Sequence, residues 1–198
     1  MKNLISLILL FISIVAYGQH RIQYIGDSYF TSAVYIRALN DEIHPLSVNT
    51  ISRIGATIQT YNNQQTMSRI SKYNPDAVVI SLGTNSSYIT YNKTQHTVQL
   101  NTFIHNIRMN TNRKCKIIFI TPFMNYRNGK PNMYARQCAD NIANVCISQN
   151  CYVINTYNMF GNMLKAQRML ARDNIHLTSR GYSYVGHSVG QVIKGIIN

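Results

Sequence analysis

Three short polar segments, far apart in the chain, carry residue types used in nucleophilic catalysis. The first is Gly26-Asp27-Ser28, which directly follows an apolar run ending at Ile25. Glycine tolerates the tight turn between a strand and a helix, and a serine at a helix start faces backbone N–H groups that favour developing negative charge. This position suits a nucleophile, although a residue that only caps the following helix is the commoner use of such a tripeptide.

The other two segments could supply an oxyanion donor and a general base. Gly83-Thr84-Asn85 follows a second apolar run, and an amide there can donate an N–H to a carbonyl oxygen that gains charge. In Asp173-Asn174-Ile175-His176, the carboxylate can hold the Nδ1–H of the imidazole and leave Nε2 free to take a proton from a hydroxyl. Each segment alone is also compatible with an ordinary turn or cap, but together they predict a nucleophile, a base with its orienting carboxylate and an oxyanion donor at one rim of a sheet.

The elements that must position these residues follow from an alternation of apolar runs and amphipathic stretches. Compact runs rich in Ile and Val predict strands that are covered on both faces, and helical spacing predicts the crossovers between them. This alternation of strands and helices predicts a single, doubly wound α/β domain. In such a domain, residues at the carboxyl ends of the strands meet at one rim of the sheet. Strands are predicted at 22–25, 77–82, 116–121 and 151–155, with a further one near 43–48, and helices at 31–40, 58–73, 95–112, 133–149 and 180–197.

On these segments the chain resembles the SGNH (GDSL-type) hydrolases, esterases with a three-layer α/β/α, flavodoxin-like fold and a mostly parallel five-stranded sheet. Gly26-Asp27-Ser28 is similar to the first block of that family, Gly83-Thr84-Asn85 to the third, and Asp173 to His176 to the last. The resemblance extends from Tyr24 to about Val192. One departure is Ser86, which follows the third-block asparagine where many members carry an acidic residue.

The resemblance implies a role for each of these residues. Ser28 would be the nucleophile, His176 the general base and then the acid, and Asp173 its partner. The backbone N–H groups of Ser28 and Gly55 and the side chain of Asn85 would form the oxyanion hole. Gly55 is the best match to a degenerate second block, in the loop after the second strand. The reaction needs no metal and no organic cofactor.

The substrate is predicted from a finer resemblance to exported bacterial esterases that remove O-acetyl groups from peptidoglycan or other glycans. Tyr88 and Tyr91, shortly after the third block, are the candidate sugar contacts, although packing is the ordinary role of a single tyrosine. Polar, Asn-rich loops also favour a wet groove over a lipase-like apolar site. The alternatives are a lipase or lysophospholipase-type esterase of the same family, and a non-catalytic glycan-binding module on the esterase scaffold.

Composition limits the other classes of function. Asp and Glu number only 6 against 19 Lys and Arg in 198 residues, which gives a formal charge of +13. The basic residues are scattered and their densest run is Arg113, Lys114 and Lys116, so no nucleic-acid-binding stripe is predicted. A diffuse positive charge favours an anionic polymer, such as a cell-wall polymer, or an anionic membrane surface.

The N-terminal segment indicates export, and export bears on the state of the four cysteines. Lys2, an apolar stretch from Leu4 to Tyr17 and the small residues before Gln19 predict a signal peptide over 1–18, a mature domain over 19–198, and a periplasmic or extracellular protein without stable membrane insertion. A retained N-terminal anchor is the alternative. Export makes disulfides possible; Cys115 with Cys151 is weakly preferred on geometry, buried free thiols being the alternative, and Cys138 and Cys146 complete the set.

Overall fold

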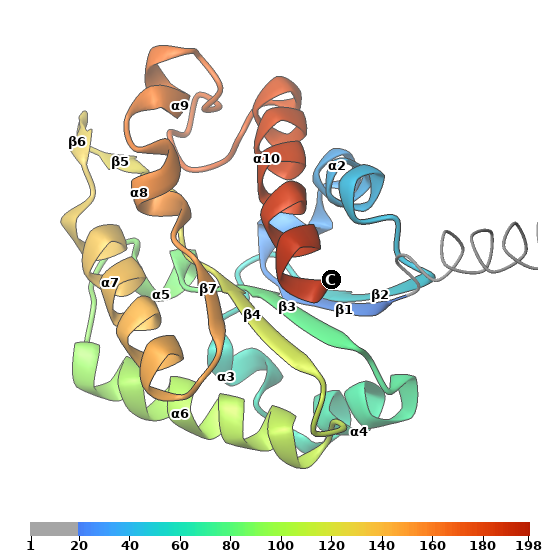
Figure 1. Cartoon of the computed structure of the whole chain (residues 1–198). Helices are drawn as coiled ribbons and strands as arrows, with labels where there is room; N and C mark the ends of the chain where they lie inside the picture. The colour runs from blue at the N-terminus through green and yellow to red at the C-terminus, as the bar shows by residue number, and fades with distance from the viewer. Residues whose placement is uncertain (1–19) are drawn as a thin grey trace, which may run out of the picture.

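Five parallel strands form one sheet at the centre of the molecule, in the order β2-β1-β3-β4-β7 (Figure 1). The computed structural model describes residues 20–198, so the predicted signal peptide lies outside the described residues. Within that range, we find no helix that combines the length and the apolar character needed to cross a membrane. The strands are β1 (Arg21–Gly26), β2 (Ser47–Ser52), β3 (Ala77–Ser81), β4 (Lys116–Ile120) and β7 (Tyr152–Ile154).

Helices cover both faces of this sheet. Two long helices, α2 (Ala33–Ile43) and α10 (Ser179–Ile197), lie together on one face. The opposite face carries α3 (Ile58–Tyr61), α4 (Gln64–Tyr73), α6 (Lys93–Met109) and α7 (Met133–Ser148) (Figure 1). The predicted three-layer α/β/α fold is confirmed.

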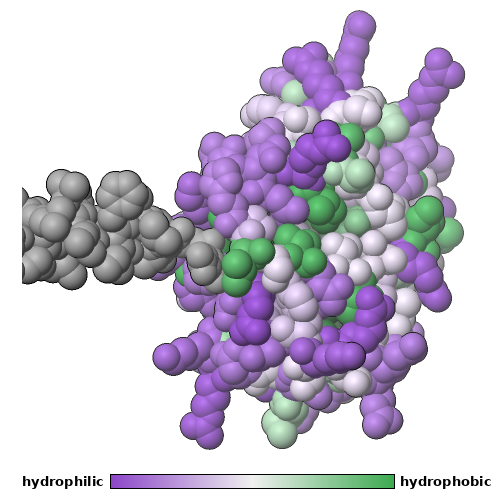
Figure 2. Space-filling view, turned by 90° about the vertical axis from the view of Figure 1, so that its right-hand side faces the viewer, coloured by the Kyte–Doolittle hydropathy of each residue, from purple (hydrophilic) through white to green (hydrophobic). Residues whose placement is uncertain are grey.

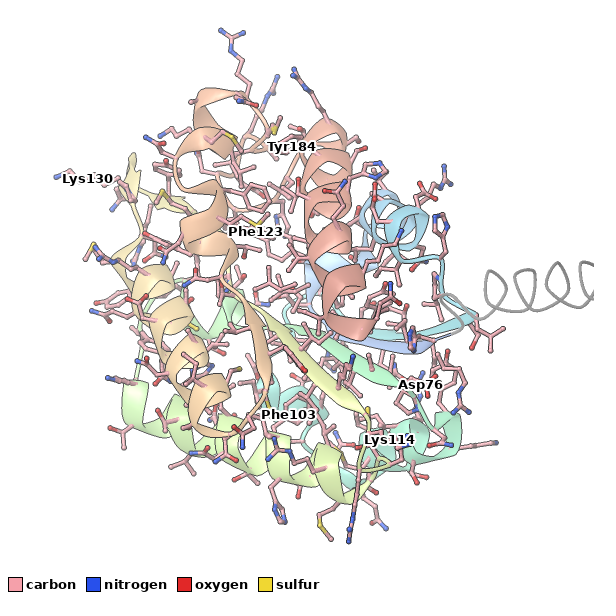
Figure 3. The ribbon with its side chains drawn as sticks, viewed as in Figure 1. Asp76, Phe103, Lys114, Phe123, Lys130 and Tyr184 are labelled. Carbon is pink, nitrogen blue, oxygen red and sulfur yellow. The ribbon has the colours of Figure 1, made fainter. Side chains whose placement is uncertain are left out.

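Side chains alternate across the strands and so feed two separate cores. Ala77 and Val79 of β3 belong to the core under α2 and α10, whereas Val78 and Ile80 belong to the core under α4, α6 and α7. Because both faces are buried, the strand reads as an uninterrupted apolar run. Figure 3 shows two of the aromatic members on opposite sides of the sheet, Phe123 in the first core and Phe103 in the second.

Close packing of α10 on α2 depends on two glycines. A Cβ on Gly186 would lie 2.6 Å from the Cβ of Ala38, and one on Gly190 would lie 2.9 Å from the Cβ of Glu42. The two helices can therefore approach only because these side chains are absent.

Figure 2 shows the face of the molecule that carries α2, where hydrophilic residues surround small apolar areas.

Two predicted elements need correction. The strand near 43–48 is displaced, because α2 continues to Ile43, His44 caps it in the left-handed conformation (φ 51°), and β2 starts only at Ser47. The single helix expected over 58–73 is two helices, because Asn63 caps α4 by accepting from the backbone N–H of Thr66 at 2.9 Å.

The sequence patterns also missed several short elements at the carboxyl rim of the sheet, and they did not decide between disulfides and free thiols for the four cysteines. The short elements are the 3₁₀ helix η1 (Ser28–Thr31), α5 (Thr84–Ser87), α8 (Thr156–Phe160), α9 (Met163–Ala166) and the hairpin strands β5 (Tyr126–Arg127) and β6 (Lys130–Pro131). All four cysteines are free thiols, so the Cys115–Cys151 disulfide is not formed.

Candidate active site

The turn that presents Ser28 follows directly from the residues around it. Gly26 ends β1 so close to its neighbours that a Cβ would lie 2.6 Å from a ring carbon of Phe30 and 3.0 Å from the carbonyl oxygen of Ser81. Asp27 then caps η1, since its Oδ1 accepts from the backbone N–H of Tyr29 at 3.1 Å. Ser28 is therefore the first residue of η1 and half-buried at the rim of the sheet.

The three residues predicted to act in proton transfer lie together. His176 Nε2 is 2.8 Å from Ser28 Oγ, and His176 Nδ1 is 2.6 Å from Asp173 Oδ2. Asp173 Oδ1 also accepts from the backbone N–H groups of Ile175, at 2.9 Å, and His176, at 3.0 Å. One carboxylate thus organises both the loop and the imidazole that the loop carries.

Asp173 is held in its charged form by these contacts. Burial acts to raise its pKa, but the hydrogen bonds from the His176 ring and from the two backbone N–H groups outweigh burial and lower the pKa of Asp173 below its usual range. An ionised acceptor at Nδ1 favours the imidazole tautomer that leaves Nε2 as the acceptor toward Ser28. The chain of contacts is therefore oriented for proton transfer from the serine hydroxyl.

Tyr29 connects the serine segment to the histidine loop. Its ring is buried, and its hydroxyl donates to the carbonyl oxygen of Ile175 at 2.7 Å. The same ring lies beside the imidazole of His176, with 5.9 Å between the ring centroids. The residue after the nucleophile thus fixes the residue before the base. Sequence reasoning missed this role, because only the adjacency of Tyr29 to Ser28 is visible in the sequence.

Asn85, from the third sequence block, makes contacts with the first block and with the segment that holds Gly55. Its Nδ2 donates to the carbonyl oxygen of Ala56 at 2.9 Å and lies 3.4 Å from Asp27 Oδ2. Gly55, next to Ala56, occupies an exposed turn with φ 76° and is not among the residues that line the cavity at Ser28. The structure thus brings Asn85 beside Ser28, whereas a Gly55 contact with the site remains a prediction.

Asp27 is a buried carboxyl group one residue from the nucleophile. Burial raises its pKa to about 7, against the lowering effects of the Tyr29 N–H and of the nearby His176. Its oxygens face the cap of η1 and the amide of Asn85. This carboxyl group therefore stabilises the turn at Ser28 and orients the amide of Asn85. Among the described residues it makes no hydrogen bond to Ser28 Oγ.

A cavity of about 500 Å³ opens over the serine hydroxyl. Tyr88 lines it, and its contact with substrate stays a prediction. Tyr91 does not line it, because its ring packs against the core under α6 and its hydroxyl lies 3.0 Å from His96 Nδ1; a contact between Tyr91 and substrate stays a prediction. The lining residues are Ser28, Thr84, Asn85, Ser86, Tyr88, Ile89, Thr90, Ile175 and His176.

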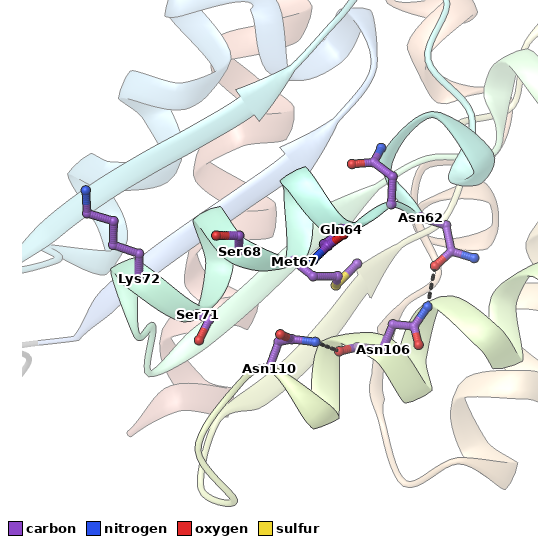
Figure 4. Close-up of a pocket in the computed structure, with 9 residues that line it drawn as sticks. Asn62, Gln64, Met67, Ser68, Ser71, Lys72, Asn106 and Asn110 are labelled. Carbon is purple, nitrogen blue, oxygen red and sulfur yellow. Dashed lines mark hydrogen bonds between the residues drawn. The ribbon is translucent and has the colours of Figure 1, made fainter.

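A larger hollow, of about 650 Å³, lies between α4 and α6 (Figure 4). Amides and hydroxyls dominate its lining, and Asn106 Nδ2 donates to Asn62 Oδ1 at 2.7 Å across it. It contains no histidine and no carboxylate, so it lacks a base for hydrolysis. The described part of the chain also holds no group of three or more His, Cys, Asp and Glu side chains that could bind a metal ion.

Comparisons with known proteins agree with this geometry. Residues 13–184 match the GDSL-like lipase/acylhydrolase family. The fold is similar to that of a lipase/acylhydrolase from Enterococcus faecalis, with a TM-score of 0.71 and 22% identity over 90% of this chain and 97% of that one. No match was found among curated proteins.

Two esterases that act on acetylated polysaccharides also share the fold. A catalytic mutant of an acetylxylan esterase from Geobacillus stearothermophilus gives a TM-score of 0.68 at 17% identity, over 87% of this chain and 93% of that one. A peptidoglycan O-acetylesterase gives 0.68 at 15% identity, over 76% of this chain and 47% of that one. The resemblance drawn from the sequence blocks is confirmed: this chain is an ester-hydrolysing enzyme and belongs to the GDSL-like lipase/acylhydrolase family.

Proposed function

We propose that the enzyme removes O-acetyl groups from a polysaccharide, such as peptidoglycan or another extracellular glycan, through a serine-bound acyl-enzyme. The observation that carries this proposal is the continuous chain of hydrogen bonds from Ser28 through His176 to Asp173. A hydroxyl, an imidazole and an ionised carboxylate in this order are the groups that acyl transfer requires.

The reaction would have two steps, acylation of Ser28 and hydrolysis of the acetyl-enzyme, and His176 would transfer a proton in both. His176 Nε2 takes the proton of Ser28 as the serine oxygen attacks the acetyl carbonyl; the C–O bond to the sugar then breaks and the sugar oxygen leaves with that proton. Water next attacks the acetyl-serine ester, gives its proton to His176, and releases acetate as the proton returns to Ser28. Asp173 stabilises the imidazolium that forms in each step.

The oxyanion would be held by three N–H groups, from the backbone of Ser28 and Gly55 and from Asn85 Nδ2. Asn85 is supported by its place in the cavity. The carbonyl of Ala56 holds one Nδ2 hydrogen, with 2.9 Å between the nitrogen and the oxygen, and the other hydrogen, which faces Asp27 Oδ2 only at 3.4 Å, is the one that would serve the oxyanion. Donors that are fixed before the reaction stabilise the developing charge without reorganisation.

The preference for a glycan ester rests on the cavity and on the structural relatives. The cavity of about 500 Å³ is lined by the hydroxyl-bearing residues Ser86, Tyr88 and Thr90 together with the apolar Ile89 and Ile175, a mixture that suits a sugar bearing a small acyl group. The relatives include enzymes for acetylated xylan and for peptidoglycan, and alanine variants of one serine and one histidine of the former are described as catalytic mutants.

Hydrolysis of p-nitrophenyl acetate tests the catalytic proposal. We expect wild type to hydrolyse it and Ser28→Ala to lose the activity, while Ser68→Ala, an exposed serine of α4, keeps it. Wild type no faster than Ser28→Ala, on this ester and on acetylated glycans, would instead indicate a glycan-binding module.

Release of acetate from a panel of acetylated polysaccharides, including O-acetylated peptidoglycan, tests the substrate. We expect acetate release that depends on Ser28. Release of free fatty acid from phospholipids, without acetate release from any glycan, would favour the lipase-type alternative.

We also propose that residues 1–18 direct export to the periplasm or the outside of the cell. The N-terminal sequence of the protein recovered from an exported fraction tests this proposal, since cleavage before Gln19 predicts a chain starting there.

A further inference from the structure

A second hollow adjoins the catalytic cavity through a shared wall. It has a volume of about 490 Å³ and lies between the hairpin β5–β6 and the first turn of α7. Asn132 Nδ2 donates to the carbonyl oxygen of Tyr88 at 3.1 Å, and Arg127 Nη1 donates to that of Ile89 at 2.8 Å. Because Tyr88 and Ile89 also line the catalytic cavity, the hairpin hollow and the catalytic cavity lie on either side of this short segment.

The lining of the hairpin hollow combines positive charge with apolar surface. Arg127 and Lys130 supply two cations, and no lining residue is acidic. Tyr134, 38% exposed, and Met133, 57% exposed, provide apolar faces beside these charges. The remaining lining residues are Asn128, Pro131 and Asn132.

These cations keep free hydrogen-bonding capacity. Arg127 uses one nitrogen on Ile89, and a guanidinium has five N–H donors, so others remain for a ligand. Lys130 extends outward from the hairpin in Figure 3. From α9, Lys165 Nζ lies 3.9 Å from the ring centroid of Tyr126 and adds a third positive charge beside the hairpin. The carboxylate nearest along α7, Asp140, lies 3.9 Å from Arg136.

We propose that the hairpin hollow is a subsite for a carboxylate-bearing sugar of an O-acetylated polysaccharide, next to the sugar whose acetyl group enters the catalytic cavity. The proposal rests on the proposed function and narrows the substrate to acidic glycans. Arginine and lysine would pair with the sugar carboxylate, and the Tyr134 ring would face the apolar side of the sugar.

Kinetics of Lys130→Gln on three esters test this subsite. The esters are an acetylated polygalacturonate as the acidic polymer, acetylated xylan as the neutral polymer, and p-nitrophenyl acetate. We expect kcat/KM on the acidic polymer to fall about three- to fivefold, mainly through KM, because an exposed ion pair contributes little more than that. Activity on the other two esters should stay unchanged, and the loss should shrink at high salt.

Lys114→Gln is the matched control, since Lys114 lies at the opposite end of the sheet from Lys130 (Figure 3) and changes the net charge equally. An equal loss in both variants would show general attraction to a cationic protein and would overturn the subsite. Equal kcat/KM of wild type on the acidic and neutral polymers would overturn it as well.

A binding measurement separates failure of the subsite from failure of the proposed function. Ser28→Ala should bind deacetylated polygalacturonate, and the added Lys130→Gln change should weaken this binding by the same factor. Binding that ignores Lys130 contradicts the subsite even if the enzyme is active. Absence of p-nitrophenyl acetate hydrolysis in wild type, with binding that depends on Lys130, would contradict the esterase chemistry alone.

Discussion

Two histidines in this molecule lie beside a potential nucleophile, but their surroundings differ. His176 faces Ser28 Oγ at 2.8 Å and Asp173 Oδ2 at 2.6 Å. His96 faces Cys138 Sγ at 4.0 Å through Nε2, and its Nδ1 lies 3.0 Å from the hydroxyl of Tyr91. The first ring has an ionised partner, whereas the second has only neutral ones, with the Asn141 amide at 3.3 Å.

Solvent access separates the two histidines further. The side chain of His176 is 38% exposed at the cavity, whereas His96 is 3% exposed. Burial lowers the pKa of His96 to about 4 and raises the pKa of the Cys138 thiol to about 12, so this pair stays neutral and hydrogen-bonded within the core. Proximity of a base to a nucleophile is therefore insufficient without a charged orienting group and an opening for substrate.

The largest expected effect comes from removing the base that faces Ser28, compared with removing the thiol that faces His96. His176→Gln should lower kcat on p-nitrophenyl acetate by roughly 10⁴-fold or more, because the base is lost. Cys138→Ala, which removes only the thiol beside His96, should leave kcat within about twofold. A large loss of kcat in the folded Cys138→Ala protein would break the comparison.

Asn85→Ala tests whether the amide at the catalytic cavity stabilises the oxyanion. We expect kcat to fall about 10²- to 10³-fold with little change in KM, because the donor acts mainly in the transition state. Asn158→Ala, at an exposed position of α8, is the control. If kcat falls less than about fivefold, Asn85 serves the loop and not the reaction.

The pH dependence of the free energy of unfolding should reveal the burial of His96. The pKa of His96 is lowered in the folded state, so its contribution to stability is present above its unfolded pKa of 6.5 and is lost as pH falls toward 4. We expect about 3 kcal/mol of such loss. Urea unfolding of wild type and His96→Gln at several pH values checks it, since equal slopes in the two proteins would contradict a buried neutral imidazole.

Tyr29→Phe should have the smallest effect, because it removes a single hydroxyl that holds the carbonyl of Ile175. We expect kcat to fall about three- to tenfold, KM to stay nearly constant, and the low-pH limb of the activity profile to shift, since the position of His176 changes. Tyr152→Phe, at an exposed position of β7, should change neither. An unchanged profile in Tyr29→Phe would assign the hydroxyl to stability alone.

Much of the fold and of the site could be predicted because both depend on strands. Continuous apolar runs identified four of the five strands, and the carboxyl ends of parallel strands meet at one rim, which brings Ser28 and Asn85 together. The spacing of Asp173 and His176 predicted their contact within one turn.

Contacts that depend on irregular backbone could not be predicted. Tyr88 and Tyr91 lie in a segment without periodicity, so nothing in the sequence tells which ring enters the cavity. The hairpin strands are two residues long and leave no pattern. The bond from Tyr29 to Ile175 joins residues 146 positions apart through a hydroxyl and a backbone carbonyl, a pair that no spacing rule connects.

The hydrogen bond between Ser28 and His176 joins residues 148 positions apart, so the two reacting groups meet only when the C-terminal loop packs against the turn after the first strand. A partly synthesised chain that ends before His176 contains the serine but no base. Such a chain cannot hydrolyse esters. Recovery of hydrolysis during refolding should therefore coincide with docking of the C-terminal segment. The rate at which enzyme activity returns would then measure the rate of that docking step.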